Sequence, residues 1–183
     1  MMALRRAANQ IHYLIDEGGI KIERSEDIEN HCVVYFAEML GGQPNILSRR
    51  ERYKITRLTK FRCYLEIKEM LVAPFTPQDI KAEILALPGN KTLGPDGFTA
   101  EFFRRSWNVV GEDVVKAVQE FFCKGRLLKQ WNATAISLIP KKEGADKVKD
   151  FRPISLCNVI YKVISKLIAR RIQDILPLMI SNT

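Results

Sequence analysis

Three cationic side chains bracket one short loop toward the C-terminal end of the chain. Lys141 and Lys142 follow the apolar stretch "TAISLIP", and Arg152 lies just beyond the polar stretch "EGADKVKD". Lysine offers a point charge and arginine a bidentate fork, and both suit phosphate oxygens. If the flanking stretches pair as strands, the cations would converge into a clamp for a triphosphate or a backbone phosphate. The spacing fits ordinary turn cations equally well, so the residues alone leave both interpretations open.

The carboxylates do not form a recognisable catalytic set. Two-metal phosphoryl transfer needs carboxylates that converge on two cations ~4 Å apart. Asp96 lies in an expected turn, Asp113 lies on an expected helix, and Asp146 and Asp150 flank a loop. The glycine-rich phosphate loops, the paired-histidine zinc motif and the serine nucleophile motif are all missing from the sequence. We therefore expect no catalytic residue and no metal site in this chain.

The cysteines argue against a zinc site, because none of the four has a partner at zinc-ligand spacing and only two histidines could assist. We expect four reduced, mostly buried thiols. No apolar run reaches the ~18 residues that a membrane span needs. The first residues, "MMALRRAANQ", lack the apolar segment of a secretory signal. These features predict an intracellular location, nucleus or cytoplasm, and no membrane partner.

The charge balance suits a polyanionic partner. The chain has 29 Lys and Arg against 21 Asp and Glu, a net charge of +8, and its pI is about 9.4. Within residues 49–62 there are seven basic residues and one acid, with Tyr53 and Phe61 between them. This run is typical of a solvated helix face. The alternative is a strip that follows phosphates and offers aromatic rings for base stacking.

The N-terminal part predicts a hairpin followed by a helix. Alternating apolar residues at Ile11, Tyr13 and Ile15 and again after Gly18 favour a β-hairpin over residues 11–22. A short helix ending at Gly18 is the alternative. Ser25 is expected to cap the next helix, which Gly41 and Gly42 end. The apolar face of that helix is Ile28, Cys32, Tyr35, Phe36, Met39 and Leu40.

Capping signals mark the helices of the middle part. Thr76 and Pro77 begin a helix with a core face at Ile80, Ile84 and Leu87. The stretch "GPDG", residues 94–97, fits a type I turn. Thr99 is expected to cap a helix that buries Phe102, Phe103 and Trp107, and an amphipathic helix then runs to Gly125.

After Trp131 the pattern changes to strands. "TAISLIPKK" predicts a strand of a buried sheet, and "DFRPISL" predicts a second strand that pairs with it in antiparallel fashion. A long helix follows, with apolar residues from Val159 to Ile172 and Lys162, Lys166, Arg170 and Arg171 on its wetter side. The order of elements predicts a mostly helical α+β fold with an antiparallel β-hairpin.

Three stretches together closely resemble the reverse transcriptase of plant non-LTR (LINE-type) retrotransposons. They are "FTPQDIKAEILAL", "NKTLGPDGFTAEFF" and "AISLIPKKEGADKVKDFRPISLCNVIYKVISKLIARRI". The resemblance implies that residues 74–183 are a partial reverse transcriptase domain, namely the fingers region of a right-hand polymerase fold, truncated before the palm. Residues 1–73 would be the connector or N-terminal extension of such a polyprotein, and residues 43–73 match the family least well.

The resemblance also implies roles for particular residues. In the family, the G-P-D-G turn helps to place template RNA, although Leu93 stands here where proline is usual. The family's fingers hairpin contacts the triphosphate of the incoming nucleotide, a role that would fall to Lys141, Lys142 and Arg152. The implied template or nucleic-acid contacts are Lys91, Gly94, Pro95, Asp96, Gly97, Phe98, Asn158, Tyr161 and Lys162.

The family's catalytic aspartates lie in the palm, which follows the fingers and is absent from this sequence. We therefore expect no polymerase activity from this chain alone and a need for Mg2+ only in the complete polymerase. The expected partners are an RNA template or an RNA/DNA primer–template, a dNTP bound weakly, and the missing palm segment. Two alternatives stay open: a non-catalytic RNA-binding module, and a retroelement remnant without function.

Overall fold

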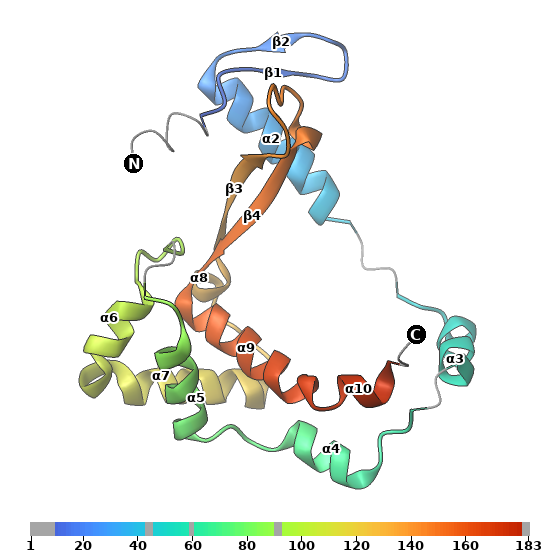
Figure 1. Cartoon of the computed structure of the whole chain (residues 1–183), viewed down its shortest axis with the longest axis vertical. Helices are drawn as coiled ribbons and strands as arrows, with labels where there is room; N and C mark the ends of the chain where they lie inside the picture. The colour runs from blue at the N-terminus through green and yellow to red at the C-terminus, as the bar shows by residue number, and fades with distance from the viewer. Residues whose placement is uncertain (1–9, 43–45, 59–60, 90–92, 181–183) are drawn as a thin grey trace. The chain divides into compact units, whose positions relative to one another are not determined.

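The computed structural model describes residues 10–42, 46–58, 61–89 and 93–180. It is 57% helical with two small antiparallel strand pairs, which confirms the predicted α+β class. The chain divides into two compact units (Figure 1). The first unit comprises Met1–Ile46 and Ile136–Ser155, and the second comprises Leu47–Ala135 and Leu156–Thr183. The boundary predicted at residue 73 is based on the resemblance to a known family, whereas these units are defined by contacts within the chain. The boundary therefore stays a prediction.

The first unit begins with the predicted hairpin. Strands β1 (Leu14–Ile15) and β2 (Lys21–Ile22) pair in antiparallel fashion, with Leu14 opposite Ile22. The Asp16 carboxylate accepts a hydrogen bond from the Ile20 amide at 2.8 Å, and Gly19 adopts a left-handed φ of 84°. The turn therefore closes as a hairpin and excludes the short helix. Leu14 is the buried residue of β1. Tyr13, which belongs to the alternating apolar residues of the predicted hairpin, is 38% exposed.

Helix α2 (Ser25–Leu40) packs on this hairpin and on the tip of the second strand pair. Its N-cap is Arg24, which makes no side-chain capping bond, so the prediction that Ser25 caps the helix is wrong by one residue. The predicted stop at Gly41 is confirmed. Met39 and Leu40 of the predicted apolar face are exposed. The core of the unit is Leu14, Ile28, Phe36, Val148 and Phe151.

The second strand pair consists of β3 (Thr134–Pro140) and β4 (Phe151–Cys157), preceded by the 3-10 turn η1 (Val148–Asp150). The antiparallel pairing is confirmed. However, most β3 residues are exposed, so the prediction of a buried sheet is wrong. The physical reason is that this sheet has only two strands in the described part of the chain, and neither face of β3 is covered along its length.

The second unit is helical. Its longer elements are α3 (Arg49–Leu58), α4 (Leu65–Val72), α5 (Pro77–Ala86), α7 (Trp107–Lys124) and α9 (Val159–Gln173). Its shorter helices are α6 (Ala100–Arg105), α8 (Lys129–Asn132) and α10 (Leu176–Met179). None of the helices in the described ranges is long and apolar enough to cross a bilayer.

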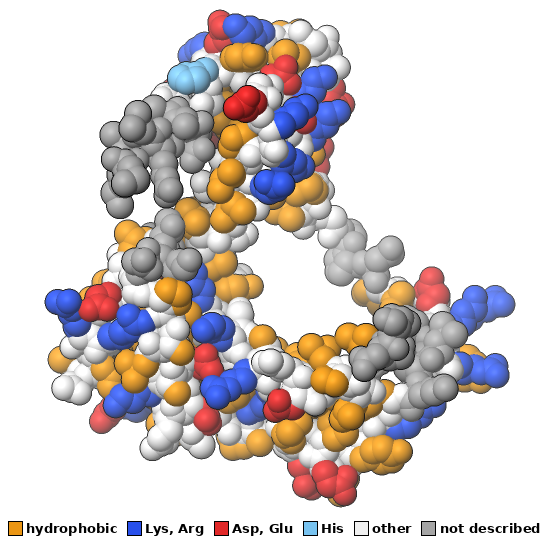
Figure 2. All heavy atoms as spheres, in the orientation of Figure 1, with side chains coloured by type: hydrophobic (Ala, Val, Ile, Leu, Met, Phe, Trp, Pro, Cys, Tyr) orange, Lys and Arg blue, Asp and Glu red, His pale blue; other side chains and the backbone are white. Residues whose placement is uncertain are grey.

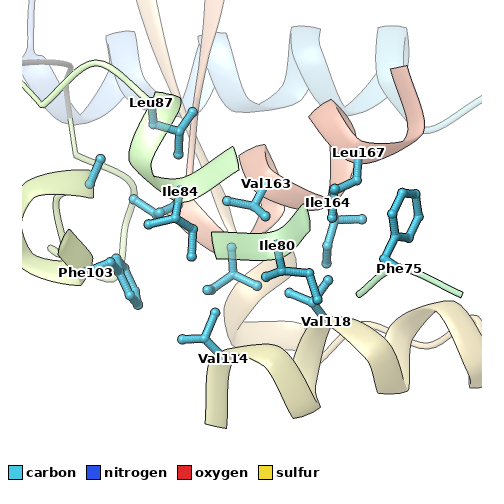
Figure 3. Packing of buried hydrophobic residues seen from close by; sticks show 13 residues of the cluster. Phe75, Ile80, Ile84, Leu87, Phe103, Val114, Val118, Val163, Ile164 and Leu167 are labelled. Atoms are coloured by element: carbon cyan, nitrogen blue, oxygen red, sulfur yellow. The ribbon is translucent and has the colours of Figure 1, made fainter. Parts of the chain in front are cut away.

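The core of the second unit forms where α5 packs against both α7 and α9 (Figure 3). Ile80 and Ile84 of α5 are fully buried, as predicted from their spacing. They lie among side chains of α7 and α9, namely Val114, Val118, Val163, Ile164 and Leu167. Each helix thus contributes an apolar stripe at helical spacing to one shared core.

The aromatic helix predicted after Thr99 is divided in two. Thr99 does cap α6, because its hydroxyl accepts a hydrogen bond from the Phe102 amide at 2.9 Å. Ser106 ends α6 and Trp107 begins α7. Of the three aromatic residues only Phe103 is buried and Trp107 is half-buried. The prediction that Phe102 lies inside is wrong, since it is 38% exposed.

The thiols are less buried than predicted. Cys32 and Cys157 are half-buried, whereas Cys63 and Cys123 are exposed, and all four are free. Burial raises the pKa of the Cys32 thiol. The expectation of mostly buried cysteines is therefore wrong, because Cys63 and Cys123 lie outside the two apolar cores.

The start of α5 makes a testable contribution to stability. Thr76 and Asp79 form a reciprocal capping box: the Asp79 amide donates to Thr76 Oγ1 at 3.1 Å, and the Thr76 amide donates to Asp79 Oδ2 at 2.9 Å. We expect Thr76→Ala to lower the free energy of unfolding by about 1 kcal/mol, whereas Thr76→Ser keeps the hydroxyl and most of the stability. Urea unfolding followed by tryptophan fluorescence measures both.

The capping box also predicts a pH dependence. Hydrogen bonds from Thr76 lower the pKa of the Asp79 carboxyl below its ordinary value. A carboxyl with a lower pKa in the folded state stabilises the fold above its unfolded pKa, and this stabilisation is lost as the pH falls through the folded pKa. The cost of Thr76→Ala should therefore shrink in acid. An equal cost for the alanine and serine variants at neutral pH would contradict the capping role.

Candidate functional site

The G-P-D-G stretch forms the predicted tight turn. The Gly97 amide donates to the Gly94 carbonyl at 3.1 Å, and Gly97 adopts a left-handed φ of 75° that favours glycine. The Asp96 carboxylate accepts a hydrogen bond from the Phe98 amide at 3.1 Å. The turn is thus closed by its own backbone and by the side chain of Asp96, which makes the local geometry independent of any ligand.

Asn158 holds this turn against the helical unit. Its side chain is fully buried, and its Oδ1 accepts a hydrogen bond from the Asp96 amide at 3.1 Å. Its Nδ2 donates to the carbonyl oxygens of Gln130 at 2.7 Å and Trp131 at 3.4 Å. Asn158 also directly precedes α9. One amide therefore joins the turn, α8 and the start of α9.

Gly94 is required because the backbone of Asn158 approaches it closely. A Cβ atom built on Gly94 would lie 2.6 Å from both the backbone N and the Cα of Asn158. Real Cβ atoms do not come so close to backbone, so a larger residue would force the turn and α9 apart. The two glycines of the turn are thus required for different reasons: Gly94 because a Cβ atom has no space there, and Gly97 because its φ is left-handed.

The buried state of Asn158 changes how its predicted role is understood. All of its side-chain polar atoms bond within the protein, so a part in nucleic-acid binding would be indirect, through the position of the turn. Sequence reasoning did not identify this bond because its two ends are 62 residues apart. The available signal was an asparagine at the N-cap of a helix, and this one makes no capping bond.

The surface beside the turn is partly aromatic. Phe98 is 45% exposed, and its ring centroid lies 4.7 Å from that of Phe102, which was expected to be buried. Pro95 and Gly97 are exposed, while Tyr161 and Lys162 on α9 are half-buried. Lys91 lies outside the described residues. The structure therefore places Phe98 and Phe102 together as the ring surface next to the turn.

The hairpin cations of the first unit differ in their partners. Lys141 Nζ donates to the Lys149 carbonyl at 2.6 Å, and Lys142 Nζ lies 3.2 Å from the Asp150 carboxylate. The Arg152 side chain is exposed and makes no hydrogen bond or ion pair with another described residue. It follows Phe151, which is buried in the core of the unit, and successive strand residues face opposite sides. Of the three cations, Arg152 is thus the one whose side chain is open to an external anion.

A hollow of about 600 Å³ opens beside the hairpin tip and includes the two lysines but not Arg152. Its other lining residues come from the segment just before β1 and from the β3–β4 hairpin, and the polar ones are Gln10, His12, Tyr13 and Glu143. The convergence of Lys141, Lys142 and Arg152 on one anion therefore stays a prediction. In the described part of the chain there is no cluster of three or more metal-ligating side chains.

The cations on the wetter side of α9 serve the fold. Arg170 and Lys166 lie 2.7 Å and 3.8 Å from the carboxylate of Glu83, whose side chain is only 8% exposed. Arg171 stacks over the Phe75 ring at 3.5 Å and donates to the Leu71 carbonyl. These contacts explain why a basic stripe on α9 need not indicate a phosphate site.

Comparison with known proteins gives relatives along most of the chain. It is 35% identical over 169 residues to the transposon TX1 uncharacterized 149 kDa protein of Xenopus laevis, a match that covers 91% of this chain and 12% of that protein. It is 34% identical over 82 residues to the retrovirus-related Pol polyprotein from type-1 retrotransposable element R2 of Bradysia coprophila, covering 44% of this chain and 9% of that protein. Its relatives are proteins of transposable elements.

The chain spans about a tenth of the length of these curated relatives. No protein-family model matches it. These matches therefore support homology between this chain and proteins of retroelements.

Proposed function

We propose that this chain is the template- and nucleotide-positioning fingers part of the reverse transcriptase of a non-LTR retrotransposon. The observation that carries the proposal is the hydrogen bond between Asn158 and the Asp96 amide. It joins the two stretches that most resemble the family, the G-P-D-G turn and the segment that follows "RPISLC", although they are far apart in the sequence. Motifs that act on one substrate are expected to meet in this way.

The proposed division of labour follows from the two units. In the second unit the pinned turn, with Phe98 and Phe102 beside it, would hold the template strand in one path. In the first unit Arg152 would bind triphosphate oxygens through its guanidinium fork, and Lys141 and Lys142 would add positive charge. The chain contributes positioning and charge rather than metal chemistry, so in this proposal it does not extend a primer by itself. A palm segment would complete the polymerase.

Nucleotide binding tests the role of Arg152. We expect Arg152→Ala to weaken the affinity of the full chain for a dNTP about tenfold or more, because a hydrogen bond to a charged group contributes roughly 1.5–3 kcal/mol. The fold should be unchanged, since the Arg152 side chain is exposed and bonds to no other described residue. Titration of a fluorescent dNTP analogue measures the affinity, and circular dichroism checks the fold.

Lys147→Ala provides the matched control. Lys147 is another exposed cation of the same loop, but it lines a different hollow, beside α2 and the N-terminal hairpin. Its loss removes one charge without touching the proposed clamp, so dNTP affinity should hardly change. Equal dNTP affinity of Arg152→Ala and the wild type would remove the clamp from the proposal.

A second candidate function is a nucleic-acid-binding module without chemistry. The observation that favours it is the net charge of +8 over a chain of 183 residues. It differs from the first proposal in one measurable respect: RNA would bind while dNTP affinity stayed undetectable in the wild type and in Arg152→Ala alike.

A further inference from the structure

One face of α3 carries four cations around a single tyrosine. At about 100° per residue, Arg49, Tyr53, Arg57, Arg50 and Lys54 follow one another across an arc of about 140°. All five side chains are exposed. The guanidinium carbon of Arg57 lies 6.0 Å from the centre of the Tyr53 ring, as expected for neighbours on one helix face. We call this set of five residues the α3 basic face.

The one acid of α3 does not neutralise this face. The Glu51 carboxylate accepts a hydrogen bond from the Ser48 amide at 2.8 Å, while the Glu51 amide bonds to the Ser48 hydroxyl at 3.3 Å. Hydrogen bonds from Ser48 lower the pKa of Glu51, so its charge stays at the start of the helix. No ion pair joins the four cations to a carboxylate within the described ranges.

Packing does not account for the five residues of the α3 basic face. No described side chain of this helix is buried, and no other element packs extensively against it in the described part of the chain. Figure 2 shows Lys and Arg side chains projecting from α3 into solvent. A helix of ten residues is marginal in water without tertiary contacts, so the reciprocal hydrogen bonds between Ser48 and Glu51 help to hold α3. A polyanion bound along the face would stabilise the helix further.

Tyr53 indicates which polyanion fits. Its side chain is 62% exposed in the middle of the cations. An exposed ring flanked by arginine and lysine matches the way proteins hold single strands, with cations along the phosphates and an aromatic ring on an unpaired base. A duplex keeps its bases stacked inside and offers no such partner.

We propose that the α3 basic face binds the backbone of a single-stranded nucleic acid, with Tyr53 stacked on one base. The proposal rests on charge complementarity and on the exposed ring. It is independent of the reverse transcriptase assignment and of Arg152, which belongs to the other unit. It assigns the basic run to binding, which was the alternative interpretation of these residues, whereas the charge pattern alone is typical of a solvated helix face.

Salt dependence of RNA binding tests the proposal in the full chain. The variant Arg49→Gln/Arg50→Gln/Lys54→Gln removes three charges and keeps helix-forming side chains. Each neutralised phosphate of a single strand contributes about 0.7 to the log–log slope of affinity against salt, so this slope should become shallower by about 2. Fluorescence anisotropy with a labelled RNA of about 16 nucleotides, measured from ~50 to ~200 mM KCl, gives the slope.

Two further variants separate charge from stacking. The control Lys116→Gln/Lys124→Gln/Lys129→Gln removes the same charge from exposed positions elsewhere in the unit and should leave the slope nearly as in the wild type. Tyr53→Leu should weaken RNA binding about fivefold or more without changing the slope, because stacking is not electrostatic. Circular dichroism confirms that each variant keeps its helices.

The outcomes are distinct. A slope change shared equally by the α3 variant and the control would reduce the effect to net charge and overturn the site. Wild-type affinity in Tyr53→Leu would overturn the stacking of a base. Heparin is a polyanion without bases. If Tyr53→Leu weakened heparin binding as much as RNA binding, the stacking of a base would also be overturned. None of these results bears on dNTP binding by Arg152, so the two proposals fail separately.

Discussion

Replacing Gly94 with alanine is expected to lower the free energy of unfolding of the second unit by about 3 kcal/mol. The added Cβ would lie 2.6 Å from backbone atoms of Asn158, and backbone cannot yield as a flexible side chain does. The turn and α9 would have to separate. The Asn158 oxygen would then lose its bond to the Asp96 amide while the side chain is fully buried. The steric clash and the unsatisfied Asn158 oxygen therefore both lower the free energy of unfolding.

Tryptophan fluorescence during urea unfolding measures the stability of the second unit, which contains the Gly94 turn. Both tryptophans of the chain, Trp107 and Trp131, pack against the core of the second unit. Gly42→Ala, in the first unit, is the control for a harmless Cβ, because a Cβ there meets nothing within 4 Å and its φ is not in the left-handed range, so it should leave the tryptophan transition unchanged. A Gly94→Ala variant as stable as Gly42→Ala would show that the turn is not held as described.

Replacing Ile80 with alanine is expected to cost about 4 kcal/mol of unfolding free energy. Ile80 is fully buried where α5 packs against α7 and α9, as Figure 3 shows. Truncation removes apolar atoms from the centre of the core and leaves a cavity that three helices cannot close by small shifts. The loss should therefore lie well above the average for point substitutions.

Leu85→Ala is the matched control on the same helix. Leu85 is 48% exposed, and its described bond, from Arg104 to its carbonyl, uses the backbone and survives the substitution. It should cost less than about 1 kcal/mol. Equal losses for Ile80→Ala and Leu85→Ala in the same urea titration would mean that α5 does not present its Ile80 face to the core.

Features that depend on neighbouring residues followed from the sequence. The caps at Thr76 and Thr99, the end of α7 at Gly125 and the G-P-D-G turn are all confirmed. Each relies on hydrogen bonds or backbone angles within a few residues. The buried positions Ile80 and Ile84 were also predicted, because a helix repeats its core face at a regular spacing.

The predictions of side-chain burial were wrong where burial depends on distant parts of the chain. The pattern of β3 was apolar enough for a buried strand, but its sheet has two strands in the described residues, so most of β3 is exposed. Phe102 and Phe103 are equivalent in type, and only the packing of α6 against α5 and α7 decides that Phe103 is buried. No local pattern contains that information.

The candidate site shows the same division. The residue types could be predicted from the chain alone: a rigid turn, a basic loop, a basic helix and the motif order that resembles a retroelement polymerase. Which polar groups already have partners became clear from the fold. The Asn158 side chain is buried and bonds to the turn, Lys142 lies against Asp150, and the Arg152 side chain bonds to no other described residue. The physical reason is that a side chain's partners are set by which backbone segments pack together, and those segments are far apart in the sequence.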